Sequence, residues 1–219
     1  MANWKADLPQ LPAALKEDVS LQQASLQAIE DDEYVERRLF SQQRLEGVSG
    51  GSLEFKACRF DHCRLTDVEV GRISFVDCEF NKCEMSNLTL QNAALKRVTF
   101  RDCHLTGLGM EKTALTDARF QSCMMDYLSV SESKLDRVTF ADCRLRESFW
   151  NTVRLGRVAF DKADLVQSEW SFTPLYQQDL STCRIDGIRI ALADLRGLRL
   201  TSHQLVALSG LLGVEVTDV

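Results

Sequence analysis

The sequence predicts an all-β fold, a solenoid in which the chain winds through square coils, and two repeats of different length carry that prediction. Every fifth residue from Phe55 to Leu205 is large and apolar, which makes 31 consecutive matches. With 45% apolar residues in the chain, chance gives such a run with a probability on the order of 10⁻¹¹. Phenylalanine also recurs every 20 residues from Phe40 to Phe160. A helix or a flat strand cannot keep a period of five on one side, so the chain must turn a corner every five residues.

Each five-residue unit directs two side chains into the solenoid and three to solvent. The large apolar residue is one inward position, and the residue two places before it is mostly small or apolar, as in Cys58–Phe60 and Val98–Phe100. Charged residues concentrate at the other three positions. Four units close a coil of 20 residues, and successive coils should lie about 4.8 Å apart. The eight coils from Phe40 to Leu200 predict a rod of roughly 38 Å, and Gly50 is the one break in the register.

All eight cysteines occupy the small inward position, and we expect free thiols that pack as small hydrophobic residues. Met1–Pro12 has no apolar signal-peptide core, which indicates a cytoplasmic protein with reduced thiols. A zinc site or a reactive thiol is the alternative, but neighbouring cysteines are five residues apart instead of the two to four of a zinc knuckle. The eight are Cys58, Cys63, Cys78, Cys83, Cys103, Cys123, Cys143 and Cys183.

Residues 1–38 precede the repeat and are expected to form an N-terminal capping segment, either extended or with a short helix around 13–30. Acidic residues cluster at its end, beginning at Glu30. A run of charge usually faces solvent, and the functional alternative is a partner-binding site. The candidate partner-binding residues are Asp31, Asp32, Glu33 and Glu36.

Residues 39–200 should form the β-helix, and residues 201–219 a C-terminal cap that also serves in dimerisation. Ser202–Ser209 predicts a short helix with Ser202 as its N-cap, and 214–216 a short strand. This segment holds more apolar residues than a free tail would. The candidate dimer-interface residues are Leu205, Leu208, Leu211, Leu212, Val214 and Val216.

The chain carries none of the motifs of a nucleophile elbow, a P-loop or a dinucleotide fold. The register continues from Leu53 to Leu205 without an insertion, so no loop is expected to build a concave pocket. We therefore expect a protein that is not an enzyme, with no catalytic residues, no cofactor and no metal.

The units Cys58–Phe60, Ala163–Leu165 and Ala193–Leu195 resemble the pentapeptide-repeat family, which implies a right-handed quadrilateral β-helix. The ending resembles Qnr-type quinolone-resistance proteins in Leu195–Leu200, in His203 with Gln204 and in Leu212–Val214, and the stretch Glu30–Phe60 resembles their Gram-positive chromosomal branch. Such proteins are homodimers joined tail to tail. They resemble B-form DNA in width and surface charge.

The Qnr resemblance implies a rod that binds DNA gyrase and topoisomerase IV, can compete with DNA and protects these enzymes from fluoroquinolones. Several members carry projecting loops, and this chain resembles the loop-free ones. The expected partners are thus type II topoisomerases and a second copy of the chain, without direct contact to nucleic acid or membrane.

The distribution of charge bears on DNA mimicry. The net charge of −6 lies in the terminal segments, because residues 51–200 hold 21 basic and 21 acidic residues. A DNA mimic should present acidic faces. One face instead gathers basic residues, so mimicry requires acidic residues on other faces or at the dimer ends. The alternative function is a structural or scaffold solenoid that presents a flat β-face to another protein. The basic residues are Lys96, Arg97, Lys134, Arg137, Arg154 and Arg157.

Overall fold

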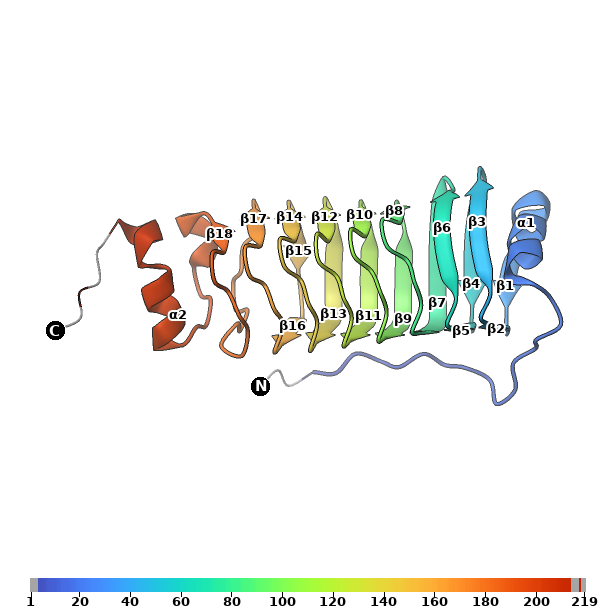
Figure 1. The fold of residues 1–219 in the computed structure, drawn as a ribbon, viewed down its shortest axis with the longest axis horizontal. Helices are drawn as coiled ribbons and strands as arrows, with labels where there is room; N and C mark the ends of the chain where they lie inside the picture. The colour runs from blue at the N-terminus through green and yellow to red at the C-terminus, as the bar shows by residue number, and fades with distance from the viewer. Residues whose placement is uncertain (1–3, 214–216, 218–219) are drawn as a thin grey trace.

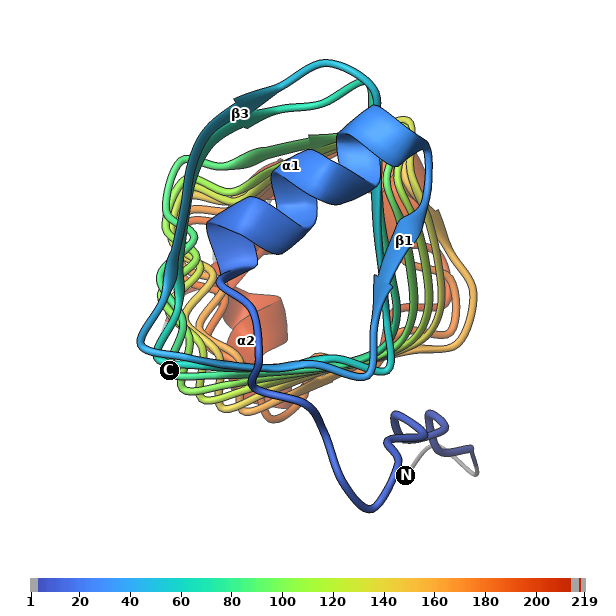
Figure 2. The same ribbon diagram turned by 90° about the vertical axis from the view of Figure 1, so that its right-hand side faces the viewer.

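The computed structural model describes residues 4–213 and residue 217, and it is a straight rod of stacked coils (Figure 1). Seen along its axis the rod has four sides, and from the N-terminal end the chain runs clockwise as it recedes, which makes the solenoid right-handed (Figure 2). The predicted right-handed quadrilateral β-helix with a short C-terminal helix is confirmed.

Within the described residues, all strand pairs are parallel and join residues 20 apart, as in Phe60 with Phe80. The strands there form a sheet of ten, a sheet of six and a sheet of two. Their bounds are β1 Tyr34–Glu36, β2 Leu39–Ser41, β3 Arg44–Ser49, β4 Ser52–Lys56, β5 Arg59–Asp61, β6 Arg64–Glu69, β7 Arg72–Asn81, β8 Thr89–Gln91, β9 Ala94–Arg101, β10 Gly109–Glu111, β11 Ala114–Gln121, β12 Ser129–Ser131, β13 Lys134–Ala141, β14 Phe149–Asn151, β15 Arg154–Leu155, β16 Val158–Asp161, β17 Glu169–Ser171 and β18 Arg189–Ile190.

The period of 20 arises because identical side chains stack from coil to coil. The rings of Phe80 and Phe100 lie 4.5 Å apart with an interplanar angle of 6°, and those of Trp150 and Trp170 lie 4.7 Å apart with an angle of 2°. These spacings match the distance between neighbouring strands, so each ring fills one layer of the core.

The period of five arises at the corners. Residues such as Asp77, Asp102 and Asp117 have φ between 52° and 58°, and this left-handed conformation recurs at nearly every fifth residue through the rod. The left-handed region is costly for residues other than glycine, and it persists here because the paired strands on both sides of each corner hold it in place. Most of these corner residues are exposed or partly exposed, which explains why polar residues are tolerated there.

The prediction for the cysteines is confirmed, because all eight are free and buried. Their thiols donate to main-chain carbonyls, as in Cys103 to Phe80 O at 3.4 Å. Serine and threonine occupy the same inward position in other coils, for example Thr113, whose hydroxyl donates to Leu90 O. The narrow interior therefore selects a small residue that can satisfy a carbonyl.

The N-terminal end of the rod is covered by helix α1, Leu21–Asp31 (Figure 2). Ser20 is its N-cap and accepts the N–H of Gln23. Leu21 and Ala28 belong to the buried core. Before α1, the chain runs extended along the outside of the rod, so residues preceding the repeat form both a helix and an extended segment (Figure 1).

The C-terminal end carries η1, Leu192–Leu195, α2, Ser202–Ala207, and η2, Ser209–Leu212. The predicted N-cap Ser202 is wrong by one residue. Thr201 caps α2, and its hydroxyl accepts the N–H of Gln204. The inward register also ends earlier than predicted, since Leu205 lies on α2 and its side chain is 55% exposed. The predicted strand at 214–216 lies outside the described residues.

Candidate interaction surfaces

The C-terminal candidates divide between the surface and the interior. Leu205 is exposed on α2, whereas Leu208 is 5% exposed and belongs to the core. Leu211 is partly buried and packs against that core. The side chain of Leu212, as well as Val214 and Val216, lies outside the described residues. Val206 is 51% exposed beside Leu205 and was missed, because the period of five does not continue into a helix.

Helix α2 is attached to the rod through Gln204, which is nearly buried. Its amide Nε2 donates to Leu180 O and to Cys183 O, both at 2.8 Å. Its Oε1 accepts the N–H of Thr201 at 2.8 Å and completes a capping box. The side chain thus satisfies carbonyls at the open end of the solenoid, where no further coil can donate to them. The outer side of α2 is left with Leu205 and Val206.

The acidic candidates Asp31, Asp32, Glu33 and Glu36 are all exposed. They lie where α1 turns into β1, at the opposite end of the rod from α2 (Figure 1). Asp32 is the left-handed C-cap of α1, and the Glu33 N–H donates to Ala28 O. The turn therefore gathers these carboxylates at one edge of the N-terminal cap.

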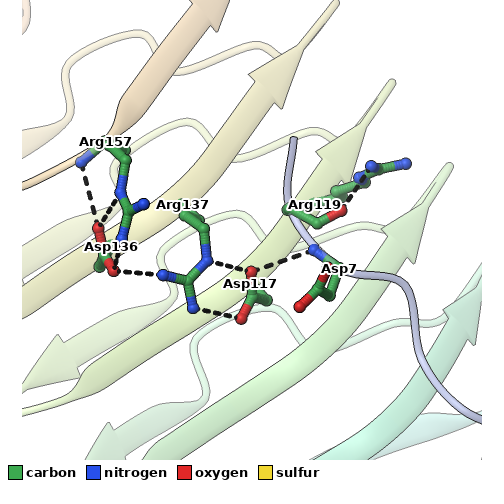
Figure 3. Close-up of polar contacts among 7 residues, drawn as sticks. Asp7, Asp117, Arg119, Asp136, Arg137 and Arg157 are labelled. Carbon is green, nitrogen blue, oxygen red and sulfur yellow. Dashed lines mark hydrogen bonds and ion pairs between the residues drawn. The ribbon is translucent and has the colours of Figure 1, made fainter. Parts of the chain in front are cut away.

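Several basic residues on the rod pair with carboxylates in neighbouring coils. Arg97 Nε donates to Asp77 Oδ1 at 2.6 Å, and Arg137 Nη2 donates to Asp117 Oδ2 at 2.6 Å. Arg137 Nη1 also donates to Asp136 Oδ2 at 2.8 Å, and Asp136 accepts in turn from Arg157 (Figure 3). Three of the six residues in the expected basic stripe are consequently neutralised along one corner of the rod.

These pairs hold the carboxylates in their ionised form. Hydrogen bonds from Arg137 lower the pKa of Asp117 below its usual value, and hydrogen bonds from Arg157 do the same for Asp136. At Asp77 burial raises the pKa, but bonds from Arg97 and from the Gln10 N–H outweigh it, so the pKa is lowered overall. This corner ladder, Asp77–Arg97–Asp117–Arg137, is thus a row of fixed ionic hydrogen-bonding groups.

The buried cysteine thiols are poorly suited to act as nucleophiles or metal ligands. Burial raises the pKa of Cys58 and of Cys183 to about 11, which keeps both as unreactive thiols at neutral pH. Cys143 differs, because a hydrogen bond from Cys123 lowers its pKa, but it is 2% exposed. Among the described residues, no group of three or more His, Cys, Asp or Glu side chains is arranged to hold a metal ion.

The surface of the rod is hollowed beside β15 and β16. A groove of about 1360 Å³ lies between the coil of β15 and β16 and the coil that follows it. Trp4, Leu155, Phe172 and Tyr176 are among its lining residues. The side chain of Phe172 is 80% exposed and that of Tyr176 is 59% exposed. No helix in the described part of the chain combines the length and apolar character needed to cross a membrane.

Comparison with protein families identifies the repeat. The model of the pentapeptide repeat region matches residues 53–109, 73–150 and 94–170, which together span 53–170. The chain belongs to the pentapeptide-repeat family. No curated protein matches this pentapeptide-repeat chain.

Solved structures similar to this pentapeptide-repeat chain include QnrB1, a plasmid-mediated fluoroquinolone resistance protein. A trypsin-treated variant of QnrB1 is 16% identical, with 84% of this chain and 99% of that chain covered and a TM-score of 0.38. Full-length QnrB1 is 15% identical, with 83% and 99% covered and a TM-score of 0.36. HetL from the cyanobacterium Nostoc, a protein involved in regulating heterocyst differentiation, is 14% identical, with 76% and 86% covered and a TM-score of 0.32.

Proposed function

We propose that this pentapeptide-repeat protein is a rod of the Qnr type, without enzymatic activity, that binds DNA gyrase and topoisomerase IV and protects them from fluoroquinolones. The observation that carries the proposal is the end of the rod. Helix α2 closes the solenoid and leaves Leu205 and Val206 exposed side by side at its tip. The terminal sequence that resembles Qnr-type proteins includes Gln204, the residue that fastens this helix.

Two copies joined through α2 would form one longer rod. Eight coils at about 4.8 Å give roughly 38 Å for one copy, so a tail-to-tail dimer presents roughly twice that length. In such a dimer the acidic edges around Asp32 and Glu36 come to lie at the two far ends. Because the rod between them is balanced in charge, we assign attraction to a basic DNA-binding surface to these ends.

A second candidate function is a scaffold solenoid that presents a flat face to another protein. The pairing of charges across coils favours it. Arg59 bonds Glu79, Arg97 bonds Asp77, and Arg189 bonds Glu169, which leaves sheet faces of low net charge. Flat, neutral faces suit a protein partner better than they suit the imitation of a polyanion.

A gyrase supercoiling assay with and without ciprofloxacin separates the two functions. The topoisomerase-binding protein should restore supercoiling in the presence of the drug and should bind gyrase directly. The Leu205→Glu, Val206→Glu double variant should lose that protection, because it cannot dimerise, whereas Ala207→Glu on the same exposed helix should keep it. A chain that neither binds gyrase nor changes supercoiling or its drug sensitivity would establish the scaffold function instead.

A further inference from the structure

Residues 4–16 lie extended along one corner of the rod, crossing several coils, and we call this segment the strap (Figure 1). At one end Lys16 forms a β-bridge with Arg38 beside the first coil. At the other end Trp4 lies at the groove next to β15 and β16. The strap therefore connects distant coils, and its contacts show what kind of chain this corner accepts.

The rod binds the strap through main-chain atoms of the strap. Asp117 accepts the N–H of Asp7 at 3.1 Å, Asp77 accepts the N–H of Gln10 at 2.9 Å, and Arg119 donates to Ala6 O at 2.7 Å. In Figure 3 the strap passes over the strands beside Asp117 and Arg119. Groups on the rod thus recognise a peptide backbone, and most strap side chains contribute nothing to these bonds.

The spacing of the two carboxylates matches an extended peptide. Asp77 and Asp117 lie two coils apart, which is roughly 10 Å along the rod. Asp7 and Gln10 are three residues apart, and three extended residues also span roughly 10 Å. Each carboxylate is fixed by an arginine of the next coil, so it is ionised and oriented before the peptide arrives. The corner ladder is therefore preorganised for an extended chain that runs along the rod axis.

Two side-chain positions of the strap are selective. Ala6 is 4% exposed, so its place accepts only a small residue, whereas Leu8 is 53% exposed and faces solvent. Two residues before Ala6, Trp4 meets the aromatic groove. The corner therefore selects a peptide in which an aromatic residue is followed two places later by a small residue.

The groove exists because a proline interrupts the strand pairing. In earlier coils the residue equivalent to Pro174 donates its N–H to the coil before, as Lys134 does to Thr113 O and Arg154 to Ser133 O. Pro174 has no N–H to donate. Among the described residues no strand pairs with β15 or β16 on this side, which leaves room between Leu155 and Tyr176.

From these contacts we propose that the corner ladder and the aromatic groove form a docking surface for an extended peptide segment of a partner protein, and that the strap is its built-in occupant. The partner segment carries an aromatic residue followed two places later by a small one. While the strap is bound, the surface is masked, and a partner must displace it. This inference goes beyond the proposed function and does not depend on topoisomerase binding.

The test uses the full chain and a fluorescent synthetic peptide that corresponds to residues 4–15. Ala6→Glu places a charge in a buried position and should release the strap, whereas Leu8→Glu, at an exposed position, should leave it bound. Trypsin cleavage after Lys5 reports release, and thermal unfolding reports an intact rod. We expect the peptide to bind the Ala6→Glu chain at least tenfold more tightly than it binds the wild-type or Leu8→Glu chain.

Peptide variants test how the surface recognises its ligand. Replacing the outward residues Lys5, Asp7 and Leu8 of the peptide by serine should change its affinity less than threefold, since the main chain makes the bonds. Replacing Ala6 of the peptide by glutamate should abolish binding. Adding Arg119→Ala to the Ala6→Glu chain should weaken binding at least fivefold, because the bond to the Ala6 carbonyl is lost.

Three results would overturn the proposal. The first is an Ala6→Glu chain that is folded and cleaved faster at Lys5 but does not bind the peptide. The second is an Ala6→Glu chain whose strap is as protected from trypsin as in the wild type. The third is a wild-type dimer, seen by light scattering, that Ala6→Glu abolishes and Leu8→Glu preserves, because the occupant would then be the strap of a second copy.

Discussion

Arg137 reaches back one coil and donates two hydrogen bonds to Asp117, one of them from Nη2 to Oδ2 at 2.6 Å. Asp117 is 3% exposed, whereas the Arg137 side chain is 26% exposed, so the carboxylate of this ion pair is shielded from solvent. The same carboxylate accepts the N–H of Asp7 from the strap. One buried carboxylate thus connects two coils of the solenoid with a segment 110 residues away in the sequence.

Low pH should reduce the stability of the folded protein, because it protonates the carboxylate of Asp117. The pKa of Asp117 is lower in the folded chain than in the unfolded one, so its stabilisation is present above the unfolded value of about 3.9 and is lost as the pH falls through the folded value. We expect Asp117→Asn to be about 1–3 kcal/mol less stable at pH 7 and to lose less stability than wild type below pH 4. Thermal unfolding from pH 7 to pH 2 measures both.

Asp102→Asn is the control for that experiment, because Asp102 occupies the same kind of corner but is exposed. It should keep the stability and the pH dependence of the wild type. Equal pH profiles for wild type and Asp117→Asn would show that the Arg137 pair does not contribute to acid stability.

The aromatic stack should dominate the stability of the C-terminal coils. Trp170 is 1% exposed and stacks on Trp150, so Trp170→Ala should cost about 3–5 kcal/mol. Phe172→Ala, two residues away and on the exterior, should change stability by less than about 0.5 kcal/mol. Urea unfolding followed by circular dichroism measures the difference. Similar losses in both variants would contradict the assignment of inward and outward positions.

The cysteine thiols should be unreactive in the native protein. Hydrogen bonding with Cys123 and burial raise the pKa of Cys103 to about 12, and none of the eight cysteines is more than 7% exposed. We expect a thiol-specific chromogenic reagent to label no cysteine in the folded chain and all eight in guanidinium chloride. Labelling of the folded chain at the rate of a free cysteine would show that the core opens or that a thiol is exposed.

Gln204 should control closure of the C-terminal end. Gln204→Ala leaves the carbonyls of Leu180 and Cys183 without this donor and should cost about 1–3 kcal/mol. Gln204→Glu keeps an acceptor for the Thr201 N–H but cannot donate to the carbonyls, so it should be impaired as well. Hydrogen exchange of β18 should accelerate in both variants and stay unchanged in His203→Ala, whose side chain is exposed. If hydrogen exchange of β18 were equal in all three variants, the packing of α2 and not the hydrogen bonds of Gln204 would close the C-terminal end.

Dimerisation should depend on the exposed residues of α2. Leu205→Glu combined with Val206→Glu should convert a dimer to a monomer in light scattering while keeping the unfolding temperature of one protomer. Ala207→Glu should remain dimeric. Leu208 is unsuitable as a probe, because its side chain is buried within the protomer and a charge there would disrupt the cap. A monomeric wild type would remove the C-terminal dimer from the proposed function.

The order of side chains along the rod could be predicted because it depends on local geometry that repeats. A corner every five residues and a return every 20 place Phe60, Phe80 and Phe100 in one stack regardless of what lies elsewhere in the chain. The same reasoning placed all eight cysteines inside. Where the coil ends, the reasoning fails, and Leu205 moves from the expected interior to the surface of a helix.

The sequence pattern predicted only part of the candidate surfaces. The acidic residues near Asp32 were found as a charge run, but the exposure of Val206 and the role of Gln204 depend on how α2 meets the last coil. Pro174 was visible in the sequence, yet its effect depends on a ladder bond that only the stacked neighbour defines.

The sequence by itself determined the solenoid, its coil length and its inward residues, because these follow from a short-range pattern repeated many times. Only the tertiary structure decided the pairing of Arg137 with Asp117 and the course of the strap over them. Both join residues on outward positions, where the repeat imposes no side-chain identity. Charge pairing across coils and contacts over 110 residues depend on which residues lie close together in three dimensions. A pattern that repeats every five residues does not predict that proximity.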